Sequence, residues 1–196
     1  MGSVVTAKKS YQTGILFQKA ATGLLMALVF VVTFNLGSEL FIIVLYEVIT
    51  LCLITICFAD MKYEIIPLSV VITASLASGI LLYFISPTMI MSHIFAALGA
   101  GAFFLLIFLV TRGRGMGFGD VIFSFFMGLL LGFPQILFGL YITFILGAAI
   151  SLGLIAFKKK KLHGGTIPFG PFLVLGTFTM MIWGEAIMHI FASYLT

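Results

Sequence analysis

The chain alternates between long apolar stretches and short connections rich in Gly, Pro, Ser and charged residues. Apolar stretches of about 20 residues are long enough to cross the hydrocarbon core of a bilayer as α-helices. We therefore expect one transmembrane domain over residues 1–196, an all-α polytopic helical bundle with some helices short or broken near the functional site. The seven predicted crossings are residues 16–36, 40–59, 66–85, 89–111, 121–133, 135–157 and 169–191.

The composition narrows the class of protein further. Hydrophobic residues make up 62% of the chain and charged residues only 8%, against roughly a quarter charged in ordinary soluble domains. The mean hydropathy is +1.30. Six acidic and ten basic side chains are too few to cover a water-soluble surface. A soluble enzyme, a disordered or fibrous chain and a nucleic-acid-binding protein are thus excluded.

The basic residues predict the orientation of the bundle. With seven crossings, all ten Lys and Arg side chains fall on one face of the membrane, which the positive-inside rule makes cytosolic. This pattern needs the short crossing at 121–133, whose 13 residues span only about 20 Å. The N-terminus is then cytosolic and the C-terminus external. The basic residues are Lys8, Lys9, Lys19, Lys62, Arg112, Arg114 and Lys158–Lys161.

Two acidic residues lie at the ends of predicted crossings, close to the membrane interior. Asp60 ends the second predicted crossing and Asp120 opens the fifth, which places both at the cytosolic face although they are 60 residues apart in the sequence. Acids near a membrane interior are costly and point to function. Two carboxyl groups around one water could perform aspartic proteolysis, one as the base that activates water and one as the acid that polarises the carbonyl.

Simpler structural roles are open for both aspartates. Asp120 could be a helix N-cap, a position that Asp favours. Asp60 could be a solvated interfacial residue paired with Lys62. If both act in catalysis, the ends of their own helices predict their roles, because a helix N-terminus favours a negative charge and a C-terminus disfavours it. We then expect Asp120 to be the base and Asp60 the protonated acid.

Glycines alternate through the loop before Asp120, at Gly113, Gly115, Gly117 and Gly119. Glycine allows close approach of another backbone, so a peptide substrate could lie against this strip. The alternative is a flexible loop whose two arginines hold lipid phosphates. A dinucleotide-phosphate loop is disfavoured, because no strand precedes the glycines.

Three separated motifs carry a resemblance to a known family. Gly117–Asp120 matches the GxGD motif of intramembrane aspartic proteases, and residues 115–134 resemble the corresponding stretch of bacterial type IV prepilin peptidases. Asp60 followed by Ile66-Pro67 resembles the first catalytic aspartate of that family and its downstream Ile-Pro. Residues 168–171, Pro-Phe-Gly-Pro, resemble the stretch that opens its last crossing.

The resemblance implies a membrane aspartic endopeptidase that removes the basic leader peptide from prepilins or pseudopilins at the cytosolic face of the bacterial cytoplasmic membrane. It implies membrane lipids as partners, pilus or secretion assembly components as possible ones, and no nucleic acid. By resemblance, the catalytic residues are Asp60 and Asp120. The residues expected to form the active-site loops or contact the substrate are Gly117, Gly119, Pro67, Pro168, Gly170 and Pro171.

The chain departs from the family pattern at three points. Many members carry a further cytosolic domain with two Cys pairs, linked to N-methylation of the product; this sequence resembles a short form without it, so N-methyltransferase activity is not implied. Ile122 stands where the family often has Lys. Leu68 stands where the family usually has Asp or Asn.

The remaining polar residues favour structural roles. Glu47 lies 13 residues before Asp60, roughly 20 Å away along a helix, so it cannot join the same site. Glu185 and His189 are four residues apart, as in an ordinary helical pair. His93 is expected near the outer side, with local partners. We expect no metal ion and no cofactor.

Two other functions compete with a peptidase. In a transporter or channel, Asp60 and Asp120 would bind ions or protons, although both aspartates at one face do not make a continuous pathway. In a non-catalytic relative, the chain would bind pilin helices as an assembly factor, and Ile122 keeps this alternative open. Leader removal from a co-expressed prepilin would separate these functions.

Overall fold

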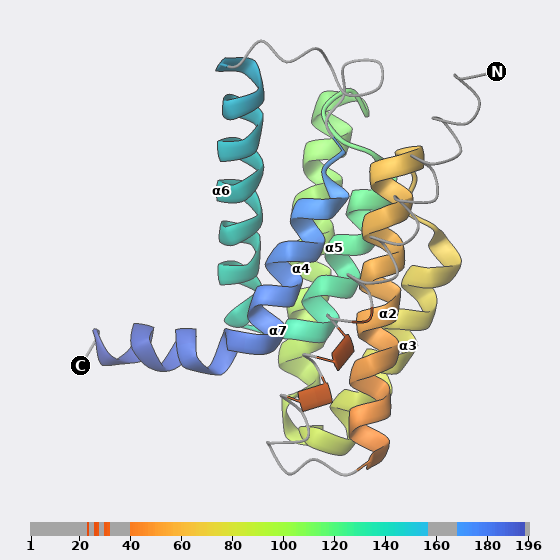
Figure 1. Ribbon diagram of the computed structural model, residues 1–196. Helices are drawn as coiled ribbons and strands as arrows, with labels where there is room; N and C mark the ends of the chain where they lie inside the picture. Colours follow the sequence, from red (N-terminus) through yellow and green to blue (C-terminus); the bar gives the residue numbers. More distant parts are fainter. Residues whose placement is uncertain (1–22, 24–25, 28–29, 32–39, 157–167, 195–196) are drawn as a thin grey trace, which may run out of the picture.

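The structure is a computed structural model that describes residues 23, 26–27, 30–31, 40–156 and 168–194, with the side chains of 154–156 excepted (Figure 1). Most of the first predicted crossing lies outside the described residues, as does the loop that carries Lys158–Lys161. The continuous part of the described bundle begins at Leu40.

All regular structure in the described residues is helical, which confirms the predicted fold class. Five helices are long and apolar enough to cross a membrane, with the 3-10 turn counted together with α4. The sixth, α5, is apolar but has only 14 residues, so the count of seven crossings stays a prediction. The elements are α2 (Leu40–Tyr63), α3 (Leu68–Ile85), the 3-10 turn η1 (Pro87–Met89), α4 (Ile90–Thr111), α5 (Phe118–Leu131), α6 (Gln135–Ala156) and α7 (Gly170–Ser193).

The helix α5 runs antiparallel along most of α4. At one end the rings of Phe108 and Phe118 meet edge to face, with centroids 5.6 Å apart. At the other end the Nδ1 atom of His93 donates a hydrogen bond to the carbonyl oxygen of Leu129 at 2.8 Å, so His93 has a local partner as expected. The turn after α5 therefore lies beside the start of α4, although α5 itself is only about 21 Å long.

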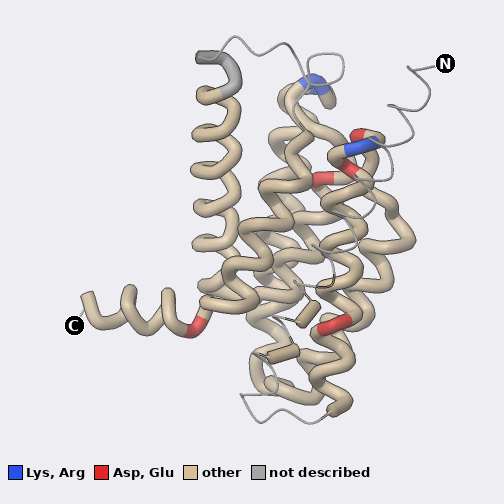
Figure 2. Tube along the Cα trace, viewed as in Figure 1, with Lys and Arg blue, Asp and Glu red and all other residues tan. Residues whose placement is uncertain are grey.

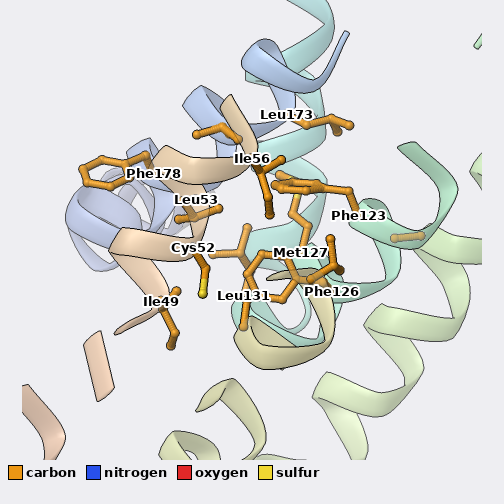
Figure 3. Packing of buried hydrophobic residues seen from close by; sticks show 14 of the residues in the cluster. Ile49, Cys52, Leu53, Ile56, Phe123, Phe126, Met127, Leu131, Leu173 and Phe178 are labelled. Atoms are coloured by element: carbon orange, nitrogen blue, oxygen red, sulfur yellow. The ribbon is translucent and has the colours of Figure 1, made fainter. Parts of the chain in front are cut away.

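The core cluster takes residues from α2 to α7, and Figure 3 shows the part that α2, α5 and α7 contribute. Ile49, Leu53 and Ile56 of α2 are fully buried in this cluster, as are Phe123 and Met127 of α5. Many large apolar side chains on the outer faces of the helices are exposed, as expected where lipid replaces water. Packing of close-fitting surfaces, rather than escape from water, then holds such helices together.

The helix α6 associates mainly with α7, through small residues. Thr143 on α6 donates a hydrogen bond to the carbonyl oxygen of Phe172 on α7 at 3.2 Å. Gly176 faces this threonine with no room for a side chain. Beyond this contact, the C-terminal part of α7 turns away from the bundle (Figure 1).

The charged residues are unevenly distributed along the bundle. In the described part of the chain, the Lys and Arg residues gather at one end, with acidic residues among them (Figure 2). Lys62 lies in the last turn of α2, Arg112 caps the end of α4 and Arg114 lies in the loop after it. The three described basic residues thus lie at one end of the bundle, and the prediction that all ten share one membrane face stays a prediction.

Candidate active site

Asp60 lies in the last turn of α2 and is buried, with 6% of its surface exposed. The backbone N–H of Gly170, the first residue of α7, donates a hydrogen bond to its Oδ2 atom at 2.8 Å. A Cβ atom at position 170 would lie 2.5 Å from the same oxygen. Only glycine therefore lets the start of α7 approach this carboxyl group.

Asp120 lies in the first turn of α5 and is buried to the same degree, with 7% exposed. It is not the N-cap: Gly117 holds that position, and its N–H donates to Oδ2 of Asp120 at 3.1 Å. The carboxylate thus reaches back to the cap from the third helical position, as an acidic residue does in a capping box. Asp120 does help to begin its helix, and it also faces a pocket.

Asp60 and Asp120 line one pocket of about 560 Å³, together with three segments that are distant in the sequence. These are residues 64–66 between α2 and α3, residues 113–119 between α4 and α5, and residues 168–169 before α7. The structure therefore brings the two predicted aspartates together, at the end of the bundle where the described basic residues lie (Figure 2).

Gly119 holds two walls of this pocket close to each other. A Cβ atom at position 119 would lie 2.9 Å from the Cβ atom of Ile66, and 3.3 Å from its Cγ1 atom. The first turn of α5 can therefore approach the connection between α2 and α3 only because residue 119 is glycine. This contact helps to bring Asp120 to the side of the pocket where α2 ends.

The other predicted site residues fall into three groups. Gly117, Gly119 and Pro168 line the pocket. Gly170 does not line it but binds Asp60 through its backbone. Pro67 caps the start of α3 and Pro171 lies in the first turn of α7, and neither lines the pocket.

Further lining residues were not among the predicted site residues. Glu64 and Arg114 bring one acidic and one basic group, and Phe118 and Phe169 bring aromatic rings. Glu64 adopts φ +54°, a left-handed conformation that is uncommon outside glycine. Its position four residues after Asp60, at the helix end, is the sequence signal that could have assigned it to the site.

Ile122, which stands where the resembling family often has Lys, is half-buried and packs against the core rather than lining the pocket. Glu47 lies in the middle of α2, away from the pocket, and both of its carboxylate oxygens are buried without a hydrogen-bond partner. Glu185 and His189 are exposed on α7. Among the residues described, no three His, Cys, Asp or Glu side chains group as metal ligands would.

Burial, and after it the negative charge of Asp60, raise the pKa of Asp120 to about 6, against the lowering effect of the Gly117 N–H. Asp120 precedes the apolar run of α5 and faces the pocket. A carboxyl group with this pKa is half protonated at about pH 6 and still mostly ionised at pH 7. The expected division of roles between Asp120 and Asp60 stays a prediction.

The arrangement suits hydrolysis by two carboxyl groups. Two nearby carboxyls do not both ionise cheaply, so a proton is retained between them. One group can then accept a proton from water while the other donates one. The pocket offers this pair beside a glycine-rich wall that a peptide backbone can approach.

The central part of the chain is similar to known proteins. Residues 47–152 match the model of the Type IV leader peptidase family. A prepilin leader peptidase/N-methyltransferase of Stutzerimonas stutzeri is 33% identical over 88 residues, which are 44% of this chain and 29% of that protein. A protein of the same name from Pseudomonas aeruginosa is 28% identical over 102 residues, 52% of this chain and 34% of the relative.

These matches span about a third of the length of each curated relative. No solved structure matches the chain. The matched family region, residues 47–152, contains Asp60 and Asp120 and the pocket segments at 64–66 and 113–119, but not the segment that begins α7.

Proposed function

Because the chain belongs to the Type IV leader peptidase family, we propose that it is a membrane-embedded aspartic endopeptidase. Its substrates are prepilins or pseudopilins, from which it removes the basic leader at the cytosolic face of the bacterial cytoplasmic membrane. The observation that carries the proposal is the meeting of Asp60 and Asp120, from helices 60 residues apart, in one pocket at the basic end of the bundle.

In the proposed reaction, the ionised aspartate takes a proton from water, and the resulting hydroxide attacks the carbonyl carbon of the scissile peptide bond. The protonated aspartate donates its proton to the carbonyl oxygen, so that a neutral tetrahedral intermediate forms. The C–N bond then breaks, the amine leaves with a proton, and the carbonyl reforms. One water and one peptide bond yield one carboxyl and one amino terminus.

The location of the pocket fits a substrate that is partly in the membrane. An apolar helix of the substrate can lie in the bilayer beside the exposed apolar faces of the bundle. Its cleavage site would then lie at the membrane surface, where residues 64–66 and 113–119 line the pocket. The glycines of the second segment allow the substrate backbone to lie close to Asp120.

The relatives are named for two activities, and the proposal covers the peptidase activity alone. Asp60 and Asp120 explain hydrolysis, and both lie within the matched region. The proposal assigns no residue of this chain to methyl transfer.

The test is co-expression with a candidate prepilin in a bacterial host from which its own prepilin peptidase has been deleted. We expect a shorter product whose new N-terminus, read by mass spectrometry, follows the basic leader. Persistence of the full-length precursor, with the protein present in the membrane, across a panel of prepilins and pseudopilins would contradict the proposal.

A further inference from the structure

The start of α7 presents a single backbone donor away from its own helix, and Asp60 accepts it. The N–H groups of Phe172 and Leu173 bond back to the carbonyl oxygen of Phe169, at 3.0 and 3.3 Å. Pro171 has no N–H to donate. The remaining donor of the first turn is Gly170, which bonds to Oδ2 of Asp60 at 2.8 Å.

Gly170 lies closer to the carboxyl group of Asp60 than the first residue of a helix needs to lie to any neighbour. Many residues can occupy the first position of a helix, but a side chain at position 170 would collide with Oδ2, Cγ and Cβ of Asp60, at 2.5, 2.8 and 3.1 Å. The carboxyl group therefore lies directly against the positive end of a 24-residue helix. The bond between the Gly170 N–H and Oδ2 is 2.8 Å long, on the short side of N–H···O hydrogen bonds.

Asp120 is held differently. Its donor, the N–H of Gly117, is the cap of its own helix and lies at 3.1 Å, on the long side of N–H···O hydrogen bonds. The other charged groups that line the pocket are Glu64 and Arg114. Little of either side chain is exposed, 6% for Asp60 and 7% for Asp120, and burial opposes the charge on both of them.

We infer that the N-terminus of α7 keeps Asp60 ionised, so that Asp60 is the base that activates water, Asp120 is the acid that protonates the scissile carbonyl, and Gly170 is a positioning residue for Asp60. This reverses the roles expected from the helix to which each aspartate belongs. The catalytic roles rest on the proposed function, whereas the location of the charge does not.

The test follows the protonated carboxyl band by infrared absorption through a pH titration of the full-length protein in lipid vesicles. Asp60→Asn leaves Asp120 as the remaining carboxyl of the pair, and Asp120→Asn leaves Asp60. Difference spectra against the variant with both changes isolate each band. We expect the midpoint in Asp120→Asn to lie at lower pH than the midpoint in Asp60→Asn. The opposite order would overturn the assignment.

A second comparison tests Gly170 itself. Adding Gly170→Ala to Asp120→Asn should raise the midpoint of the remaining Asp60 band by about one pH unit or more, because an N–H bond to the charged form is lost. Adding it to Asp60→Asn should leave the Asp120 band unmoved. Gly79→Ala, at a site with open space around it, is the matched control and should shift neither band. An unchanged Asp60 band with Gly170→Ala would overturn the positioning role.

These outcomes do not depend on peptidase activity. Should the protein cleave no prepilin, the proposed function fails and the infrared comparison still decides where the charge lies. Should Gly170→Ala fail to accumulate in the membrane, the comparison of Asp60→Asn with Asp120→Asn alone decides which aspartate carries the charge.

Discussion

Asp60 and Asp120 are each less than one-tenth exposed, and each accepts a backbone N–H at the start of a helix. Burial of an ionised carboxyl is costly unless hydrogen bonds compensate it. The two glycine amides supply this compensation without adding side-chain bulk to the pocket. Both carboxyl groups are thus buried with a hydrogen-bond donor, and both line the pocket.

Asp60→Asn and Asp120→Asn should each abolish leader removal, because an amide can act neither as the base nor as the acid. We expect a loss of at least about 10²–10⁴-fold, the usual contribution of a positioned acid or base. The measurement is cleavage of a co-expressed prepilin, with the membrane level of each variant compared by immunoblot.

The matched controls are Glu47→Gln and Glu185→Gln, which change acids outside the pocket and should retain cleavage. Substantial activity in either aspartate variant would refute a mechanism that uses both carboxyl groups.

The pKa of Asp120 should respond to the charge on Asp60. The negative charge of Asp60 disfavours ionisation of Asp120, so Asp60→Asn should lower the pKa of Asp120 from about 6 towards the ordinary range. The measurement is the midpoint of the Asp120 infrared band in the wild type and in Asp60→Asn. Glu185→Gln is the control that should leave the midpoint unchanged. An equal or higher midpoint in Asp60→Asn would mean that the two carboxyls are not coupled.

At the scale of the helices, α5 is held against α4 by a contact that only glycine allows. A Cβ atom at Gly128 would lie 2.5 Å from the carbonyl oxygen of Ala96. Close approach of backbones at small residues is the usual way in which helices associate in a membrane. This contact fixes the course of the short α5, and with it the position of Asp120 at its other end.

Gly128→Ala should destabilise the α4–α5 pair by about 1–3 kcal/mol or more, because the obstructing atoms belong to the backbone and cannot move aside. Gly99→Ala is the matched control in α4, since it faces open space and alanine favours a helix over glycine. The measurement is the midpoint of thermal unfolding in detergent. A midpoint for Gly128→Ala equal to that of Gly99→Ala would show that α4 and α5 do not approach this closely.

The helices could be predicted from the sequence more completely than the site. Apolar runs end at charged or Gly-Pro turns, so the predicted crossings coincide with α2 to α7 to within a few residues; α2 continues past Asp60 to Tyr63, and α5 begins at Phe118 rather than at Val121. The pairing of Asp60 with Asp120 could be predicted, because topology places two helix ends at one face.

The donor for Asp60 could not be predicted, because it comes from a residue 110 positions later. Local rules assign Gly170 to the start of a helix and Asp60 to the end of another, and they do not say that these two ends touch. For the same reason the helix ends do not indicate the burial of Asp120 or its neighbour Asp60, because both are properties of the folded pocket.

At the scale of the whole molecule, the described basic residues lie at the end where the pocket opens (Figure 2). The turn after α5 lies at the opposite end, where Ser92 donates a hydrogen bond to the carbonyl oxygen of Phe133 at 3.3 Å. Since basic residues favour the cytosolic side, the pocket is expected on the cytosolic face and this turn on the external face.

Single cysteines at Ser86 and Phe133 should therefore react with a membrane-impermeant thiol reagent added to intact cells, in a background with Cys52→Ala and Cys57→Ala. Cysteines at Tyr63 and Arg114 should react only after the cells are opened. The measurement is the labelled fraction with and without permeabilisation. Labelling of the Arg114 position in intact cells would contradict the orientation, and protection of the Phe133 position would mean that α5 does not cross.

The hydrogen bond between Gly170 and Asp60 has a consequence for the time at which the site is completed. A ribosome makes the chain from its N-terminus, so both aspartates are inserted before α7 has been synthesised. Until that helix arrives, Asp60 lacks its donor and the pocket lacks the wall formed by residues 168–169. The pocket is thus completed late in synthesis: a nascent chain halted before α7 carries both aspartates but not the wall that α7 brings to the pocket.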